Sequence, residues 1–278
     1  MIRIVTDSGA ELTKEEAKEI GVDLVSLSVT FGEDTFALLT KEDIEKYNTL
    51  IEGCKELPST SQPSPCYYEK VFNDAKEKND EVIVIALSSG LSGTYQSACI
   101  AKDLVDYDKI TVIDTLNASI GQRLILDMAL ELRDQGASRD EIIAKIEECK
   151  DKSLVFGMAD TLENLKKGGR IPPVLATIGT ALKLKPVLVL KDGVIESHSK
   201  ARGAKQGIES LCQIILSNNP DLKYPVYLGY YKEKKNMELY AEKLKAALPE
   251  AKLKEVPIGP VIATHLGGNC VIVSCMKQ

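Results

Sequence analysis

Short apolar runs alternate with amphipathic stretches of helical period through the first half of the chain. Residues 2–6, 82–87 and 110–114 have the length and the Ile/Val content of buried strands, and residues 22–31 are typical of one further extended segment. Strands that alternate with helices in this way predict a mostly parallel sheet with helices on both faces, which makes a three-layer α/β arrangement.

Helix start signals support this reading. Thr13 is followed three residues later by Glu16, and Ser138 is followed in the same way by Glu141. Each pair is a capping box, in which the two side chains satisfy the free amides of a first helical turn. Thr40 predicts the start of a further helix that ends near residue 53.

The pattern changes near residue 153. Residues 187–190 and 194–197 are typical of two strands, and the Asp192-Gly193 pair between them is typical of a hairpin turn. The remaining predicted elements are helices at 203–216 and 236–248 and strands at 226–230, 252–256 and 271–275. We therefore predict two domains: residues 1–152 around a parallel sheet, and residues 153–278 as a second α/β domain around a mixed sheet.

Charge and cysteine usage narrow the class of partner. The 278 residues carry 35 basic and 41 acidic side chains, a net charge of −6, which argues against nucleic acid as the main partner. Seven scattered cysteines without a Cys-x-x-Cys pair, and only two histidines, make a metal site unexpected. Free thiols fit a reducing compartment. The first residues are typical of a strand and not of a signal peptide, so we expect a cytoplasmic protein.

The most informative segment follows the strand at 82–87. It is a turn of glycines and hydroxyls, with Ser92, Gly93 and Thr94 at the start of a helix. Free amides at a helix N-terminus suit an anion, hydroxyls add donors, and the carboxyl end of a parallel strand is where open α/β sheets bind ligands. The alternative is that Ser92 or Thr94 only caps the helix and that Gly90 and Gly93 serve the turn.

A second hydroxyl-rich segment has the same design. Residues 58–63 contain Thr60 and Ser61 between prolines, and Ser64-Pro65 is a good helix start. The alternative is a proline-rich connector with a cap. Because both segments precede helices, we expect them to face one anion together.

Three charged or titratable side chains lie beside glycines. They are Arg170, Arg202 and His265, the last within the glycine-rich segment 258–268, which we expect to be a loop. An arginine in such a position is able to bind a phosphate or carboxylate through two hydrogen bonds. The alternatives are a packing histidine and two solvated surface charges.

An enzyme acting on a small anion is the competing interpretation. Residues 90–94 resemble a nucleophile elbow, which would make Ser92 a serine-hydrolase nucleophile, but Thr94 replaces the last glycine of that motif. Only His198 and His265 are available as its base. Phosphoryl transfer would need a phosphate loop, and the sequence has no Gly-x-x-x-x-Gly-Lys-Ser/Thr.

Taken together and in order, these segments resemble the DegV family over nearly the whole chain. The matching segments are 4–8, 60–64, 88–98, 167–171, 200–203 and 258–265. The resemblance implies a two-domain protein that binds one long-chain fatty acid in a buried apolar tunnel. It also implies that the protein presents the carboxylate to a partner fatty-acid kinase for acyl-phosphate formation and is not itself an enzyme. No cofactor other than the bound acid is implied.

The resemblance also assigns roles to residues. The carboxylate is expected on Thr60 with Ser61, on Ser92 with the Gly93 amide, and on His265. Two arginines, Arg170 and Arg202, are expected to dock the kinase or to handle the acyl phosphate, with transient membrane contact during lipid exchange. One departure concerns the segment after the histidine, where Leu266-Gly267-Gly268 replaces the Gly-Pro-Gly frequent in the family. How this segment holds the histidine is therefore left open.

Overall fold

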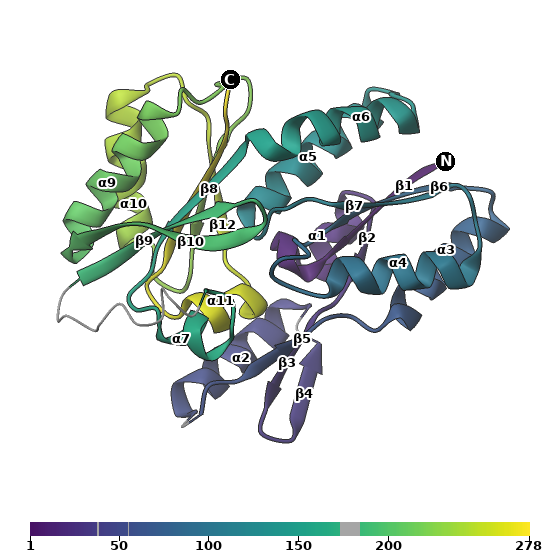
Figure 1. The fold of residues 1–278 in the computed structure, drawn as a ribbon, viewed down its shortest axis with the longest axis horizontal. Helices are drawn as coiled ribbons and strands as arrows, with labels where there is room; N and C mark the ends of the chain where they lie inside the picture. The colour runs from purple at the N-terminus through teal and green to yellow at the C-terminus, as the bar shows by residue number, and fades with distance from the viewer. Residues whose placement is uncertain (38, 55, 173–183) are drawn as a thin grey trace.

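A computed structural model describes residues 1–37, 39–54, 56–172 and 184–278, and it contains two large sheets and one small one (Figure 1). The first large sheet has the strand order β2-β1-β6-β7, and all its pairs are parallel. Its strands are β1 (Ile2–Asp7), β2 (Val22–Val25), β6 (Glu81–Ala86) and β7 (Ile110–Asp114). The predicted parallel sheet is confirmed.

Helices cover both faces of this sheet because its inner strand β6 is apolar and buried from Val82 to Ala86. Val82 and Val84 pack in one cluster with Tyr68 of α3 and Ala98 of α4, whereas Ile83 and Ile85 belong to the cluster that contains α5. The helices of this half are α1 (Lys14–Glu19), α2 (Lys41–Gly53), α3 (Pro65–Glu77), α4 (Thr94–Val105), α5 (Ile120–Asp134) and α6 (Arg139–Cys149). Alternate side chains of β6 therefore point to opposite faces of the sheet, and each set packs against a different layer of helices.

The predicted helix starts are confirmed. Thr13 and Ser138 each accept a hydrogen bond from the amide of the glutamate three residues later, and each glutamate side chain accepts one from the cap amide. Thr40 forms the same capping box, with Asp43 as its partner. These boxes satisfy first-turn amides that would otherwise lack a partner.

The second large sheet is mixed, as predicted, with the order β10-β9-β8-β13-β11-β12. Its strands are β8 (Ser153–Met158), β9 (Leu184–Lys191), β10 (Val194–Arg202), β11 (Val226–Tyr230), β12 (Leu253–Pro257) and β13 (Val271–Met276). Among the described strands of this sheet, β11 and β12 pair in parallel and the other pairs are antiparallel. The helices α9 (Gly203–Ser217) and α10 (Lys235–Ala247) cover one face, where Phe156 and Met158 pack with Leu211 and Tyr240.

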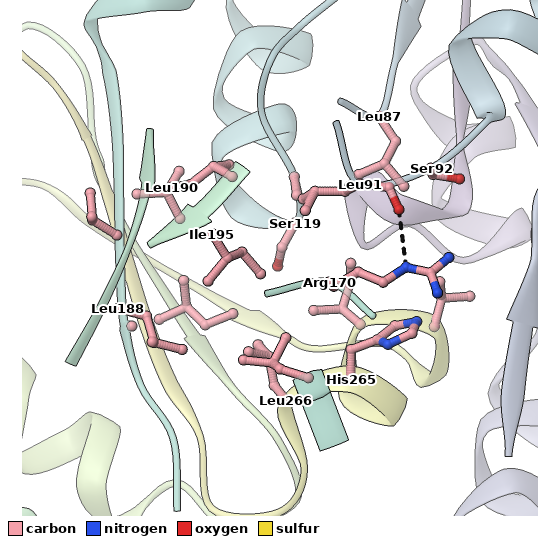
Figure 2. A pocket seen from close by; sticks show the side chains of 18 of the residues that line it. Leu87, Leu91, Ser92, Ser119, Arg170, Leu188, Leu190, Ile195, His265 and Leu266 are labelled. Carbon is pink, nitrogen blue, oxygen red and sulfur yellow. Dashed lines mark hydrogen bonds between the residues drawn. The ribbon is translucent and has the colours of Figure 1, made fainter. Parts of the chain in front are cut away.

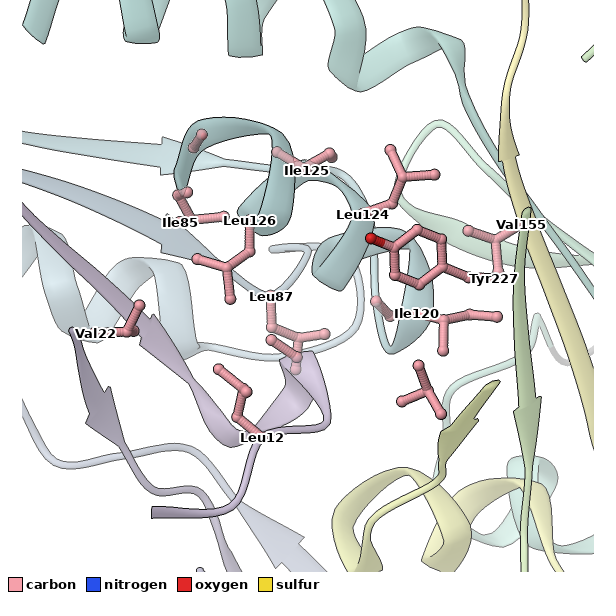
Figure 3. Packing of buried hydrophobic residues seen from close by; sticks show 14 of the residues in the cluster. Leu12, Val22, Ile85, Leu87, Ile120, Leu124, Ile125, Leu126, Val155 and Tyr227 are labelled. Atoms are coloured by element: carbon pink, nitrogen blue, oxygen red, sulfur yellow. The ribbon is translucent and has the colours of Figure 1, made fainter. Parts of the chain in front are cut away.

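The other face of the mixed sheet packs against the first half of the chain. Val155, Tyr227 and Ile272 join the same cluster as Ile120 and Leu124 of α5, so α5 lies between the two large sheets (Figure 3). The two sheets divide the chain near Ser153, but they share one apolar core. The proposed domain limits, 1–152 and 153–278, stay a prediction.

The small antiparallel sheet was not predicted. It has the order β4-β3-β5, with β3 (Ser28–Phe31), β4 (Asp34–Ala37) and β5 (Ser59–Ser61). The single extended segment expected at 22–31 is therefore two strands in two sheets, and the connector at 58–63 contains a strand. Val29 pairs with Thr60. Because these partners are far apart in sequence, no pattern of neighbouring residues predicts that their strands pair.

The segment 258–268 also differs from expectation, because most of it is a helix and not a loop. Pro260 occupies the first position of α11 (Pro260–Leu266), and Gly267 ends the helix with φ of 77°. Proline is preorganised for that first position, where no amide is needed. The glycines flank the helix and do not interrupt it. One more short helix, α7 (Glu163–Lys167), lies beside α11. Within the described ranges, none of the helices combines the length and apolar character that crossing a membrane requires.

A buried carboxylate fixes the carboxyl edge of the parallel sheet. Asp7, at the end of β1, accepts hydrogen bonds from the amides of Gly9 (2.9 Å) and Leu87 (2.8 Å) and from the Gln122 side chain (3.0 Å). Burial raises the pKa of Asp7 to about 6 in spite of these bonds, because desolvation disfavours the charged form. Asp7 therefore joins β1, the segment after β6 and α5 at one point.

We expect Asp7→Ala to lower the free energy of unfolding by about 3 kcal/mol, because each buried donor left without an acceptor costs roughly 1–3 kcal/mol. Urea denaturation followed by circular dichroism measures this. Asp134→Ala is the control, since Asp134 is exposed at the end of α5, and it should change stability little. Equal stability of the two variants would contradict this role for Asp7.

Candidate functional site

A largely apolar pocket lies between the carboxyl edge of the parallel sheet and the inner face of the mixed sheet. It contains roughly 850 Å³ of empty space, counting the part open to solvent. Its polar lining side chains are Thr60, Ser92, Ser119, Arg170 and His265. The other lining residues are apolar, so the pocket suits a ligand that is mostly hydrocarbon.

Most of the polar side chains gather at one end of the pocket (Figure 2). Leu188 and Leu190 of β9 and Ile195 of β10 lie on one side, and Ser92, Arg170 and His265 gather on the other (Figure 2). The pocket therefore has the polarity of an amphiphile, with an apolar region and one polar end.

Thr60 and His265 meet at the polar end. The Thr60 hydroxyl shares a hydrogen bond of 2.8 Å with Nε2 of His265, although 205 residues separate them. Thr60 is held by the pairing of β5 with β3, and His265 lies in the last turn of α11. The small sheet and the short helix, neither of them predicted, are thus the elements that position these two side chains.

The conformation of residues 167–170 (Lys-Gly-Gly-Arg) brings Arg170 to the polar end of the pocket, beside His265. A side chain at Gly168 would place its Cβ 2.4 Å from Nδ1 of His265, so the imidazole packs directly on this glycine. Gly169 then turns the chain with φ of +71°, a value that favours glycine. Beyond it, Nε of Arg170 donates to the Leu91 carbonyl at 3.2 Å, and Nη1 donates to the Gly168 carbonyl (Figure 2).

The polar end is positively charged through Arg170 and not through His265. Burial, with a contribution from the Arg170 charge, lowers the pKa of His265 from 6.5 to about 4. At neutral pH the imidazole is uncharged, and its buried Nδ1 has no hydrogen-bond partner among the described residues. One guanidinium, one neutral imidazole and hydroxyls make a site for a single anion.

The two hydroxyl-rich segments are in contact, whereas their joint binding of one anion stays a prediction. A side chain at Gly93 would place its Cβ 1.9 Å from Oε1 of Gln62, which follows β5, and Nε2 of Gln62 donates to Ser97 of α4 at 2.9 Å. The amide end of the Gln62 side chain therefore occupies the space that a side chain at Gly93 would fill. The Ser92 hydroxyl shares a hydrogen bond of 2.8 Å with Thr94, although Ser92 also lines the pocket.

The mixed sheet also contacts the segment that contains Ser92. The hydroxyl of Ser88 donates to the Gly193 carbonyl at 2.7 Å, in the turn of the β9–β10 hairpin. A Cβ on Gly90 would lie 2.6 Å from the same carbonyl. Both sheets thus contribute to the position of this segment.

Three of the predicted site residues, namely Ser61, Gly93 and Arg202, do not line the pocket. Ser61 is exposed on β5, where it pairs with Ser28, and Arg202 is exposed at the end of β10. The structure brings together Thr60, Ser92, Arg170 and His265, and Gly93 follows Ser92 in the chain. Arg170 was expected to dock a partner or handle an acyl phosphate, and it lies in the pocket wall.

Sequence reasoning missed Ser119, whose side chain lines the pocket and donates to Glu11 at 2.6 Å. Ser119 directly precedes α5, so the strand–hydroxyl–helix pattern that identified Ser92 also marks this position. No pattern of neighbouring residues marks Glu11 in the same way, because its hydrogen-bond partners, Ser119 and Gly259, lie in distant segments of the chain.

The geometry does not assemble a serine triad around Ser92. The Ser92 hydroxyl contacts Thr94, Nε2 of His265 contacts Thr60, and the His198 ring packs on Phe156 with 5.6 Å between ring centroids. In the part of the chain that the structure describes, no cluster of three or more His, Cys, Asp or Glu side chains is placed to hold a metal ion.

Comparisons with known proteins agree on one family. A family model described as "Uncharacterised protein, DegV family" matches residues 1–278. Protein DegV of Bacillus subtilis is 32% identical over 280 residues, covering 99% of each chain. A fatty-acid-binding DegV family protein from Thermus thermophilus has a TM-score of 0.87 at 31% identity, covering 100% of this chain and 99% of that one. A stearic-acid-binding protein from Eubacterium ventriosum has a TM-score of 0.88 at 30% identity, covering 100% and 98%.

We expect the imidazole of His265 to titrate with a pKa of about 4 in the protein without ligand. Nitrogen-15 NMR of the histidine rings against pH measures this, and a His198→Gln background leaves one imidazole to observe. Arg170→Gln should raise the pKa, because it removes the nearby positive charge. A pKa near 6.5 in the His198→Gln protein would contradict the burial of this ring.

Proposed function

The chain belongs to the DegV family, and from this membership and the geometry of the pocket we propose that it binds one long-chain fatty acid. The acyl chain occupies the apolar region between the two sheets, and the carboxylate lies at the polar end. The observation that carries the proposal is the convergence of Thr60, His265 and Arg170 at one end of an otherwise apolar pocket. The fatty acids bound by the similar proteins support it.

The apolar region supplies the affinity. Burial of hydrocarbon yields about 0.8 kcal/mol per CH₂. A chain of about fifteen methylenes therefore contributes on the order of 10 kcal/mol before the costs of binding are subtracted. The isoleucine, leucine and valine side chains of the pocket offer no polar group that would oppose this transfer.

The polar end supplies orientation. A buried carboxylate loses its hydration, and this is costly unless several donors replace the water. The guanidinium of Arg170, the hydroxyls of Thr60 and Ser92, the Gly93 amide and the imidazole of His265 are the donors that we assign to it. Arg170 provides the compensating charge, so its role in this proposal is inside the pocket.

The bound acid is proposed to be a substrate for a partner kinase in the cytoplasm. A carboxylate oxygen attacks the γ-phosphorus of ATP held by the kinase, which releases ADP and leaves an acyl phosphate. Thr60, Ser92 and His265 are each half-buried, so the polar end is partly accessible from solvent. The exposed Arg202 is assigned to kinase docking, and loading of the acid is assigned to transient membrane contact.

Protein purified from a bacterial host should contain about one long-chain fatty acid per chain, measured by denaturing extraction and mass spectrometry. Thr60→Val and Ser92→Ala should weaken retention roughly 10-fold or more, because a hydrogen bond to a charged group contributes about 1.5–3 kcal/mol.

Ser89→Ala is the matched control for these variants. It removes a hydroxyl from the same segment, but Ser89 is exposed and does not line the pocket. Lipid-free preparations that also fail to bind added palmitate and oleate would refute the proposal. Unchanged retention in both Thr60→Val and Ser92→Ala would place the carboxylate elsewhere.

Arg202→Ala should keep the normal content of fatty acid but reduce acyl-phosphate formation by the kinase, because Arg202 lies outside the pocket on the exposed end of β10. Coupled ADP release with a fatty-acid kinase measures this. Lys200→Ala, on the same strand and also exposed, is the control. A loss of bound lipid in Arg202→Ala would contradict the assignment.

A further inference from the structure

Glu11 is a buried acidic residue outside the proposed head-group site. Its exposed fraction is 7%, and its backbone has φ of 59°, which is unusual for a residue with a side chain. Oε1 accepts a hydrogen bond from the Ser119 hydroxyl at 2.6 Å, and Oε2 accepts one from the Gly259 amide at 2.6 Å. One carboxylate therefore joins three segments that are far apart in sequence.

The first partner, Ser119, is part of the pocket wall (Figure 2). It directly precedes α5 with φ of 54° and ψ of −131°, a conformation rarely adopted by residues other than glycine. Such a conformation persists only where the surrounding contacts hold it. The hydrogen bond to Glu11 is the contact that the Ser119 side chain makes.

The second partner, Gly259, caps the N-terminus of α11. This seven-residue helix carries four pocket residues, namely Val261, Ile262, His265 and Leu266. A Cβ on Gly259 would lie 2.9 Å from Oε2 of Glu11, so the carboxylate sits directly against the start of the helix. A shift of this end of α11 would move the imidazole at its other end, because the helix has fewer than three turns.

Burial of the Glu11 carboxyl group removes its hydration, and this costs free energy. Burial raises the pKa of Glu11 to about 8, in spite of the hydrogen bonds from Ser119 and Gly259 and the nearby charge of Arg123. A buried acid with such a pKa is a frequent property of functional sites, although structural networks show it as well.

We propose that Glu11 is a positioning residue for the ligand pocket, because its two oxygens fix Ser119 in the wall and the first turn of the helix that carries His265. This inference rests on the proposed function, since the ligand whose head group is positioned is the fatty acid. Glu11 does not line the pocket and acts through its two partners.

We separate a purely structural role from a positioning role with a second carboxylate, that of the half-buried Asp127. Asp127 on α5 accepts hydrogen bonds from Tyr227 of β11 at 2.5 Å and from Lys254 of β12, so it also joins the two halves of the chain. Among the described residues Asp127 does not line the pocket, and its hydrogen bonds reach neither α11 nor Ser119. Its third partner is Arg123, which also donates to the backbone carbonyl of Glu11. Asp127→Asn keeps an acceptor oxygen for Arg123, so it weakens the junction of the two halves and leaves the hydrogen bonds of the Glu11 carboxyl group to Ser119 and Gly259 in place.

The experiment compares wild type, Glu11→Ala, Glu11→Gln and Asp127→Asn, each loaded with palmitate labelled with carbon-13 at the carboxyl. The readouts are the carbon-13 shift of the bound carboxyl, the dissociation rate of the acid and the melting temperature. We expect Glu11→Ala to change the shift and to raise the dissociation rate roughly tenfold, as for the loss of a hydrogen bond of about 1.4 kcal/mol. Glu11→Gln keeps one acceptor oxygen and should fall between wild type and Glu11→Ala.

Asp127→Asn should lower the melting temperature but leave the carboxyl shift and the dissociation rate close to those of wild type. If the wild-type protein binds no palmitate, the proposed function is refuted, and so is this inference. Wild-type protein that binds palmitate, with an unchanged shift and rate in Glu11→Gln and Glu11→Ala, would overturn the role of Glu11 alone. Glu11→Gln preserves the size of the side chain, so it provides this test even if Glu11→Ala does not fold.

Discussion

The packing of α5 between the two sheets is the constraint on which the rest of the structure depends. Ile120, Leu124 and Ile125 are almost completely buried in a cluster that also contains Ile85 of the parallel sheet and Tyr227 of the mixed sheet (Figure 3). Interiors packed at this density do not deform continuously. The orientation of the two sheets is thereby fixed, and the pocket is the part of their junction that side chains leave unfilled.

Charge is handled differently in the core and in the pocket. Asp7 and Glu11 are buried with their oxygens occupied by protein donors, and burial raises the pKa of each. In the pocket the situation is reversed, because Arg170 and His265 offer donors and no described acidic side chain lines the cavity with them. The protein thus supplies donors to its own buried carboxyl groups and leaves one set of donors available, which is the electrostatic requirement for holding the carboxylate of a ligand.

Glycines give the polar end its geometry. Gly93 allows Gln62 to approach α4, and Gly168 allows the imidazole of His265 to lie against the chain that leads to Arg170. In both cases the backbone conformation is ordinary and the reason is the absence of a Cβ. The motifs that carry the family resemblance are therefore explained by close approach as much as by donor groups.

The sequence by itself determined the parallel sheet, the mixed sheet, the capped helices and the two segments around Thr60 and Ser92, because periodicity, caps and turns are properties of neighbouring residues. Only the tertiary structure decided that β3 and β5 pair, that 258–268 forms a helix, and that Arg170 lies in the pocket while Ser61 and Arg202 lie outside it. It also revealed Glu11, whose partners are 108 and 248 residues away. Such contacts depend on how distant surfaces meet, and no local pattern of residues encodes that meeting.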